Sequence, residues 1–217
     1  MATVLTPPIH TLADLLDYLG VSPKRVRYPP SPGQATEKDV LEIQAREGRL
    51  YELVKGVLVE KVMGFQESVL AAALVGFLWG FVRPRKLGLV ALPDGLMRLA
   101  PRLVLIPDVS FTSWDRIPGR RMPKKPIPNL VPDLAVEVLS PSNTRKEMAR
   151  KREDYFTAGV RLVWEVNPKT RIIEVYTAPD QFTRLGEEDT LEGGEVLPGF
   201  ALRLRELFGE LDEQGNA

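Results

Sequence analysis

The sequence predicts an α/β sandwich, in which a mixed central β-sheet is flanked by helices. Two short apolar runs rich in β-branched residues, 134–139 and 160–166, enclose a charged helical stretch at 143–158, in the order strand–helix–strand. Residues 51–61 alternate between apolar and polar on both sides of a Lys-Gly pair, which predicts a β-hairpin. Apolar residues at 66–81 recur at helical spacing, and the small residues among them would let that helix pack closely on a sheet.

Two short helices are expected before the hairpin. The first is amphipathic and runs from a capping threonine to a terminating glycine, Thr11–Gly20. After a proline-rich connector, Thr36–Asp39 resembles a capping box, so a second helix should continue to about residue 46. We expect residues 1–47 to form a helical appendage packed on a main domain of residues 48–217. These helices could instead form an oligomer contact.

Further strands are expected on either side of a loop. They are predicted at 87–91, 95–99, 103–111, 171–177, 181–185 and 200–204. The segment 114–131 is rich in proline and lacks periodicity, so it is expected to be a loop. Gly159 stands where a glycine would end the 143–158 helix, and the residues from Asp212 onward are expected to fray.

The composition is that of an ordinary soluble domain. The chain has 217 residues, of which 44% are hydrophobic and 27% charged. It has no cysteine, which excludes disulfides and thiolate metal sites and fits a cytoplasmic protein. The N-terminus does not resemble a signal peptide, and the longest apolar run, 69–82, is short for a membrane span. We therefore expect a cytoplasmic protein without a membrane partner.

Charge and histidine content limit the possible chemistry. The formal net charge is zero, so contact with nucleic acid would need a local basic patch or an oligomer. His10 is the one histidine, which excludes a Ser-His-Asp triad, a histidine-dependent nuclease site and a multi-histidine zinc site. A metal site in this chain must therefore use oxygen ligands, which favour Mg²⁺, Mn²⁺ and Ca²⁺.

Two apolar strands each carry an unexpected carboxylate. Because side chains alternate along a strand, Glu137 shares a face with Ala135, and Asp108 shares a face with Ile106 and Ser110. If the strands pair with these faces aligned, the two carboxylates converge within a few ångströms. Such groups are costly to bury unless they are paired or bound to metal, so a divalent cation would stabilise them. The alternative is structural, with Glu137 paired to an arginine and Asp108 an ordinary residue at a strand end.

Four segments together resemble a known family. They are Tyr51–Gly56 (YELVKG), Pro107–Phe111 (PDVSF), Asp133–Pro141 (DLAVEVLSP) and Gly159–Trp164 (GVRLVW). As a set they are similar to the bacterial Uma-type restriction endonuclease family of the PD-(D/E)XK nuclease superfamily. The resemblance covers about residues 40 to 178 and implies a restriction-endonuclease-like sandwich.

The resemblance also implies a site. Asp108, Glu137 and the backbone carbonyl of Val138 would bind Mg²⁺, for which Mn²⁺ may substitute, and the metal would activate a water to attack DNA. The lysine that the superfamily usually carries two residues after the acid is replaced by Leu139. Other branches of the superfamily place this lysine on the following helix.

On that helix Lys151 is the first candidate for the lysine that assists the water, and Lys146 is the second. The relatives suggest that Glu147 belongs to the same helix face as Lys151. An ordinary solvent-exposed lysine is the alternative.

Two further acids are candidates. Glu67, at the start of the 66–81 helix, could be an auxiliary catalytic acid or could simply complement the helix dipole. Gln66 lies near the position where relatives carry a histidine, so any role of that histidine is lost here. Glu52 in the hairpin could reach the site or could be an exposed strand residue.

A basic cluster lies in the loop between the two carboxylate strands. It consists of Arg116, Arg120, Arg121, Lys124 and Lys125. The loop could be an arm that contacts nucleic-acid phosphates, with Trp114 as a stacking platform. It could equally be a solvated loop or a subunit contact.

The leading hypothesis is a Mg²⁺-dependent endonuclease that cleaves DNA as a homodimer or higher homo-oligomer. One alternative is a module of the same fold that binds nucleic acid or protein without cleavage, which Leu139 supports. Another is an oligomer-forming structural protein with no nucleic-acid ligand, which the zero net charge supports. A binding module would keep its affinity for nucleic acid after Asp108→Ala, and a structural protein would show no salt-dependent binding.

Overall fold

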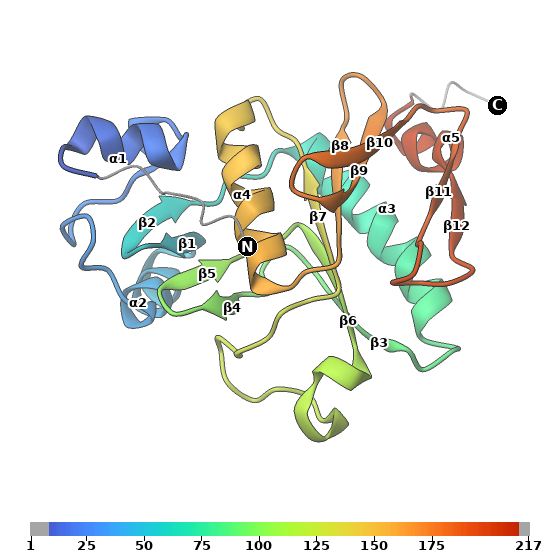
Figure 1. Cartoon of the computed structure of the whole chain (residues 1–217), viewed down its shortest axis with the longest axis horizontal. Coiled ribbons are helices and arrows are strands. Elements are labelled where there is room, and N and C mark those ends of the chain that lie inside the picture. Colours follow the sequence, from blue (N-terminus) through green and yellow to red (C-terminus); the bar gives the residue numbers. More distant parts are fainter. Residues whose placement is uncertain (1–8, 213–217) are drawn as a thin grey trace.

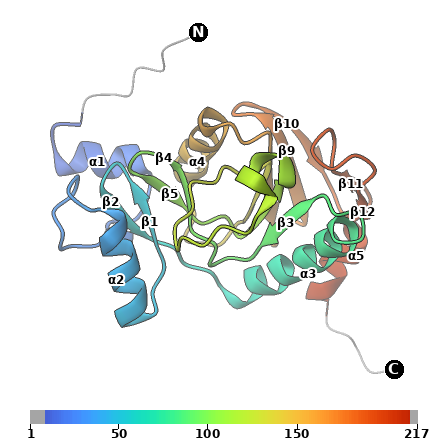
Figure 2. The same cartoon turned by 90° about the horizontal axis from the view of Figure 1, so that it is seen from below.

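A computed structural model describes residues 9–212 (Figure 1). A six-stranded mixed sheet has the strand order β10-β9-β8-β7-β6-β3, and a four-stranded sheet has the order β2-β1-β5-β4. Figure 2 shows the small sheet with helices α1 and α2 at one end of the molecule, and helices α3 and α5 at the other. The candidate site lies where the two sheets meet.

The N-terminal helices form as predicted. They are α1 (Leu12–Leu19) and α2 (Glu37–Glu47), with a short 3-10 turn at Pro23–Arg25 between them. Thr11 and Asp14 form a capping box at the start of α1, and Gly20 ends it in the left-handed conformation, with φ at 68°. Leu15 and Leu19 bury their side chains in a cluster shared with α4 and the small sheet.

The small sheet contains the predicted hairpin. Its strands are β1 (Tyr51–Val54), β2 (Val57–Glu60), β4 (Met97–Ala100) and β5 (Leu103–Leu105). Lys55 and Gly56 both have positive φ, at 49° and 77°, as a two-residue turn of this kind requires. Lys61 directly follows β2.

Helix α3 (Phe65–Val82) is apolar on all sides. By length and composition alone this helix could cross a membrane, but a core helix of a soluble protein can have the same length and composition. Its inner face, with Leu70, Leu74 and Leu78 fully buried, packs against the large sheet. The predicted helix at this position is confirmed.

The large sheet carries one helix layer on each face. Its strands are β3 (Gly88–Ala91), β6 (Val109–Ser113), β7 (Leu134–Val138), β8 (Leu162–Asn167), β9 (Ile172–Ala178) and β10 (Gln181–Leu185). Strands β7 and β8 are parallel and are joined by α4 (Arg145–Ala158), which Thr144 caps and Gly159 ends. Val136 and Trp164 face α3, whereas Ala135 and Val163 face α4. Glu137 follows the same alternation and therefore lies on the α4 side.

The prediction of one strand over 103–111 is wrong. The chain leaves the small sheet after β5 and enters the large sheet at β6, with Ile106, Pro107 and Asp108 between the two. Proline has no N–H for a sheet ladder, so it is suited to this crossing. Asp108 thus stands at the boundary of two sheets rather than within one long strand.

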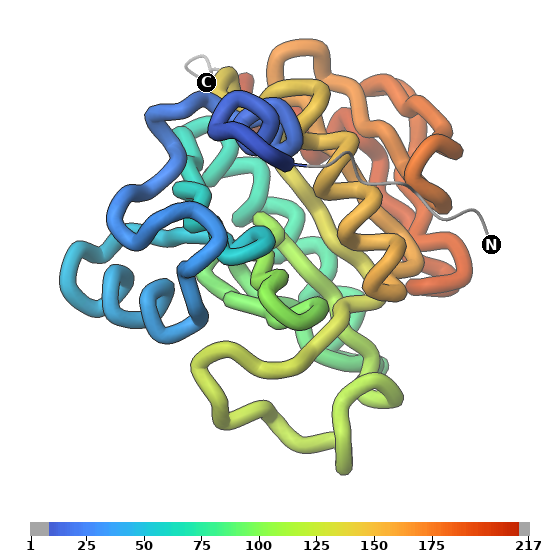
Figure 3. The backbone as a smooth tube through the Cα atoms, turned by 60° about the vertical axis from the view of Figure 1, so that its left-hand side comes forward, coloured from blue at the N-terminus to red at the C-terminus, as the bar shows by residue number. Residues whose placement is uncertain are grey.

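The remaining segments cover the edges of the fold. The predicted loop at 114–131 contains short 3-10 turns at Trp114–Arg116 and Pro118–Arg120, and it projects from the body in Figure 3. At the C-terminus, β11 (Thr190–Glu192), β12 (Ala201–Arg203), α5 (Leu204–Phe208) and a 3-10 turn at Gly209–Leu211 lie beside α3. The predicted fraying from Asp212 onward concerns residues that lie mostly outside the described range.

Candidate functional site

Asp108 and Glu137 converge as the strand alternation predicts. Strands β6 and β7 are antiparallel with Val109 opposite Val136, and continuing this register by one residue puts Asp108 opposite Glu137. The Val138 N–H donates a 2.7 Å hydrogen bond to Asp108 Oδ2. Both acidic residues are almost completely buried, at 2% and 3% exposure. Two carboxylates are therefore held together out of water, where ionised groups need a positive partner.

That partner is Lys61, which was not among the residues predicted from the sequence. Its ammonium lies 2.9 Å from Asp108 Oδ1 and 2.9 Å from Glu137 Oε2, so it bridges the two acids. Lys61 follows the hairpin at the end of β2, and its side chain is 8% exposed. Nothing in the alternation of the hairpin distinguishes it from an ordinary solvated lysine at a strand end.

A second lysine holds the other side of Glu137. Lys151 Nζ lies 2.6 Å from Glu137 Oε1 and 2.9 Å from Glu52 Oε1. The Tyr155 hydroxyl donates a 2.5 Å hydrogen bond to the same oxygen of Glu137. Glu52 also accepts a 3.1 Å hydrogen bond from the Ile106 N–H. Glu52 is therefore buried in the site and is not an exposed strand residue.

The pKa values of the two acids are shifted in opposite directions. Burial alone would raise the pKa of Glu137, but the ammonium groups of Lys151 and Lys61 outweigh it and hold the pKa at about 2. Burial raises the pKa of Asp108, and the neighbouring carboxylate of Glu137 adds to this against the opposing effect of Lys61. The nearby ammonium groups thus favour the ionised form of Glu137, whereas burial and the charge of Glu137 disfavour the ionised form of Asp108.

The other sequence-predicted residues of the helices lie elsewhere. Lys146 is exposed and pairs with Asp17 on α1. Glu147 is buried and pairs with Arg25 at 2.8 Å, so it faces the N-terminal segment instead of the Lys151 side of the site. The carboxylate of Glu67 lies against Gly64 at the start of α3, and the described residues show no hydrogen bond or ion pair between Glu67 and either acid.

The oxygen atoms at this site are of the kind that a hard cation binds. Asp108 Oδ1 has no hydrogen-bond donor among residues 9–212, although it is buried and carries the ionic contact with Lys61. Together with Glu137 Oε2 and the Val138 carbonyl it would form an oxygen set of the type that Mg²⁺ and Mn²⁺ prefer. No group of three acidic or histidine side chains suited to a metal occurs in the described range. Waters or substrate oxygens would therefore have to complete the coordination.

A row of carboxylates continues across the sheet from this pair. Glu165 stands beside Glu137 in the β7–β8 register, and Glu174 stands beside Glu165 in the β8–β9 register. Arg152 pairs with Glu165 at 2.6 Å, and Arg184 pairs with Glu174 at 2.6 Å. Glu165 and Glu174 thus each have an arginine partner.

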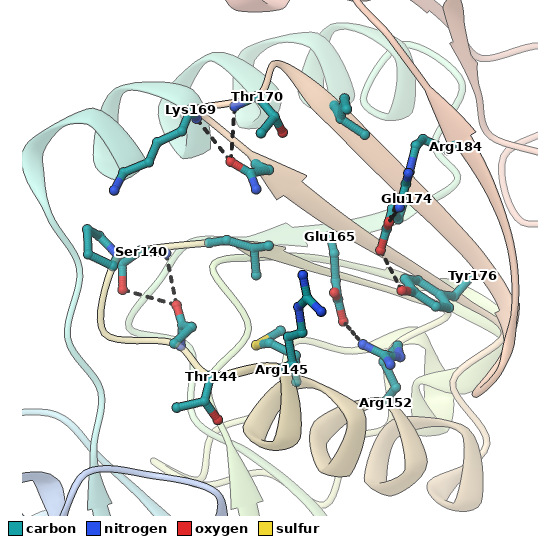
Figure 4. A pocket seen from close by; sticks show the side chains of 16 residues that line it. Ser140, Thr144, Arg145, Arg152, Glu165, Lys169, Thr170, Glu174, Tyr176 and Arg184 are labelled. Carbon is teal, nitrogen blue, oxygen red and sulfur yellow. Dashed lines mark hydrogen bonds and ion pairs between the residues drawn. The ribbon is translucent and has the colours of Figure 1, made fainter.

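A cavity of about 660 Å³ lies over the outer part of this row, at the carboxyl ends of β7 and β8 (Figure 4). Arg145, Lys169, Ser140 and Thr144 are among the residues that line it. Within residues 9–212 neither Arg145 nor Lys169 pairs with a carboxylate, whereas Arg152 in the same wall does. The cavity therefore carries uncompensated positive charge at the start of α4, where backbone N–H groups also favour an anion.

The basic loop is only partly available for contact. Arg116 pairs with the buried Asp133 at 2.9 Å, and Arg120 pairs with Asp115 at 2.6 Å. Arg121, Lys124 and Lys125 are exposed. Asp133 ties the loop to the start of β7, about 13 Å along the strand from Glu137 at about 3.3 Å per residue. The cavity lies at the other end of β7, where Leu139 and Ser140 line it, and is therefore closer to Glu137 along the strand than Asp133 is.

Comparisons with known proteins agree with this architecture. The family model Uma2, described as "Putative restriction endonuclease", matches residues 38–205 of the chain. The crystal structure of a putative nuclease belonging to DUF820 from Anabaena variabilis ATCC 29413 is similar, with a TM-score of 0.67 and 20% identity. The match covers 75% of this chain and 92% of that chain. Comparison with curated proteins found no match. The predicted fold class, a restriction-endonuclease-like sandwich with a mixed sheet and flanking helices, is confirmed.

Proposed function

Since the chain belongs to the Uma2 family of restriction-endonuclease-like proteins, we propose that it is a metal-dependent endonuclease that hydrolyses phosphodiester bonds in DNA. The observation that carries this proposal is the buried pair of Asp108 and Glu137 on neighbouring strands. A hydrophobic core gains nothing from two facing carboxylates, because each must be desolvated. Two carboxylates that face each other supply oxygen ligands of the kind that a hard cation binds.

In this proposal Asp108, Glu137 and the Val138 carbonyl hold Mg²⁺, or Mn²⁺ in its place. The bound ion would supply Lewis acidity and lower the pKa of a bound water. The Val138 N–H fixes Asp108 through Oδ2, so Oδ1, which Lys61 now contacts, is the oxygen that would face the ion.

Lys151 and Tyr155 both hold Glu137 Oε1, which leaves Oε2 on the side of Asp108. This geometry supports Lys151 as a positioning residue for Glu137. It departs from the sequence-based expectation that Lys151 orients the attacking water itself. An auxiliary role for Glu67 stays a prediction, because its carboxylate contacts Gly64 and not the acids.

The substrate contact is proposed at the cavity beside the site. Arg145 and Lys169 would bind phosphate groups of the nucleic acid there, with exposed loop residues such as Arg121 and Lys124 as a second, more distant contact. Because cutting a duplex requires two sites, we propose that the active form is a homodimer or a higher homo-oligomer.

The test is cleavage of plasmid DNA with Mg²⁺ or Mn²⁺. The wild type should cut, and Asp108→Asn and Glu137→Gln should each lose at least a hundredfold of the rate. Asp115→Asn, which changes an exposed acid on the loop, is the matched control and should cut like the wild type. Cleavage that persists in Asp108→Asn would exclude this site as its source.

A non-cleaving nucleic-acid-binding module is the second candidate. It is favoured by Lys61, which already satisfies the facing oxygens of both acids without a metal. Such a module would bind DNA in a salt-dependent way and would show no Mn²⁺ binding that depends on Asp108.

A further inference from the structure

The ammonium of Lys61 contacts the same two oxygens, Asp108 Oδ1 and Glu137 Oε2, that the proposed metal would use. We propose that Lys61 is a displaceable internal counter-cation. It holds the two acids together in the metal-free protein and leaves them when a divalent cation binds. This inference rests on the proposed metal site at Asp108 and Glu137.

Charge balance explains why a cation is needed before metal binds. Glu52, Asp108 and Glu137 are buried beside two ammonium groups, those of Lys61 and Lys151. Lys151 contacts Glu52 and Glu137 Oε1. These contacts lie on the side of Glu137 that faces away from Asp108. Without Lys61 the facing oxygens of the two acids would lie together with no positive charge between them, and they would repel each other.

The same geometry makes Lys61 and a divalent cation compete. A metal at Asp108 Oδ1 and Glu137 Oε2 would need direct contacts of about 2.0–2.6 Å with oxygens that now meet Lys61. Two cations sharing one pair of oxygens would also repel each other. Counting all three carboxylates as ionised, the cluster has one net negative charge with Lys61 in place and becomes neutral when a divalent cation replaces it. The exchange therefore removes the net charge of the cluster.

Lys61 borders a surface cavity, whereas Lys151 is enclosed by protein. The cavity has a volume of about 370 Å³, and Met63, Leu92 and the exposed Asp94 also line it. The Lys61 side chain therefore lies beside open space, into which the ammonium would move on the side where Asp94 lies. Lys151 is 2% exposed and lies between Glu137, Glu52 and the body of α4. Of the two lysines, Lys61 is the one that can leave the site.

The first test measures the accessibility of lysines in the wild-type protein. Lysines are acetylated briefly with and without Mn²⁺, and the modified sites are quantified by mass spectrometry. Mn²⁺ should increase acetylation of Lys61 at least threefold, leave Lys151 protected, and leave the exposed Lys146 equally reactive in both samples. Mn²⁺ that binds by calorimetry while Lys61 stays protected would overturn the inference.

The second test removes the competing charge. Lys61→Met keeps a side chain of comparable length without the ammonium, and its affinity for Mn²⁺ should exceed that of the wild type by at least tenfold. Lys61→Arg keeps the charge and should bind Mn²⁺ no more tightly than the wild type. If Lys61→Met is unfolded without metal, Mn²⁺ should restore its circular dichroism spectrum, because the ion replaces the missing cation.

The outcomes separate this inference from the proposed function. If the wild type and Lys61→Met bind Mn²⁺ equally, and Asp108→Asn does not bind it, the metal site stands and the displacement of Lys61 is wrong. If none of these proteins binds Mn²⁺, with or without DNA, the proposed metal site fails, and the inference fails with it.

Discussion

Lys151 and Glu137 form a 2.6 Å ion pair in which neither side chain is more than 4% exposed. The pair joins α4 to β7 and sets the orientation of the carboxylate that also faces Asp108. Lys151→Met should therefore lower the free energy of unfolding by about 3–5 kcal/mol, because it leaves a buried carboxylate with one cation fewer. At a temperature where the variant remains folded, metal-dependent cleavage should also be lost.

Lys146→Met, five residues earlier on α4, is the control for this change. Its exposed pair with Asp17 contributes little, so denaturant unfolding should agree with the wild type within about 0.5 kcal/mol. Equal effects of the two substitutions would contradict the position assigned to Lys151.

Tyr155→Phe tests the hydrogen bond that shares Glu137 Oε1 with Lys151. Losing a buried donor to an ionised carboxylate should lower the unfolding free energy by about 1.5–3 kcal/mol. Tyr176→Phe removes a similar bond to Glu174, whose side chain is 24% exposed and also pairs with Arg184. Urea titrations of both variants should show the smaller loss of unfolding free energy for Tyr176→Phe. A larger loss for Tyr176→Phe than for Tyr155→Phe would show that the Tyr155 bond is weak.

Gly20 allows α1 to approach the first turn of α4 closely. A Cβ at Gly20 would lie 2.5 Å from the Glu147 backbone nitrogen, and Gly20 also has a φ of 68°. Gly20→Ala should therefore destabilise the protein by well over the ~1 kcal/mol that a left-handed alanine alone costs. Gly48→Ala is a matched control, because Gly48 has a φ of 66° and nothing within 4 Å of its added Cβ. Thermal melts that agree for the two variants would contradict the close contact.

The N-terminal segment is tied to α4 by Arg25 and Glu147, whose side chains are 8% and 1% exposed. Glu147→Gln should lower the unfolding free energy by about 3–5 kcal/mol, because Arg25 is left in a buried place without its carboxylate. Lys38→Met, which removes an exposed pair with Glu42, should change it by no more than about 0.5 kcal/mol in the same titration. A small effect of Glu147→Gln would mean that residues 1–47 are a loosely attached appendage.

Nucleic-acid binding should depend on the cavity more than on the loop. Replacing Arg145 and Lys169 together by alanine should weaken DNA binding at low salt and reduce the slope of log affinity against log salt by about 2, or about 1 per lost phosphate contact. Replacing Arg121 and Lys124 removes the same charge from the loop and should have a smaller effect. Fluorescence anisotropy over a range of salt concentrations measures both, and a larger effect of the loop variant would reassign the contact to that arm.

Local physics accounts for the part of the fold that could be predicted. The caps at Thr11 and Gly20, the turn at Lys55-Gly56 and the end of α4 at Gly159 depend on residues within a few positions of each other. The alternation of side chains, with its period of two, also predicted that Asp108 and Glu137 would meet if their two runs paired, and the structure shows that β6 and β7 do pair.

The sequence alone thus determined helices α1 to α4, most strands and the two acids as a candidate pair, whereas α5 lies partly where a strand was expected. Only the tertiary structure decided what surrounds that pair. Lys61 reaches Glu137 across 76 residues, and Lys151 reaches Glu52 across 99, because the small sheet and α4 pack together over the end of β7. The break at Pro107 has the same origin, since only the meeting of two sheets requires the chain to cross there. Contacts of this kind depend on how separate layers pack, and no local spacing encodes them.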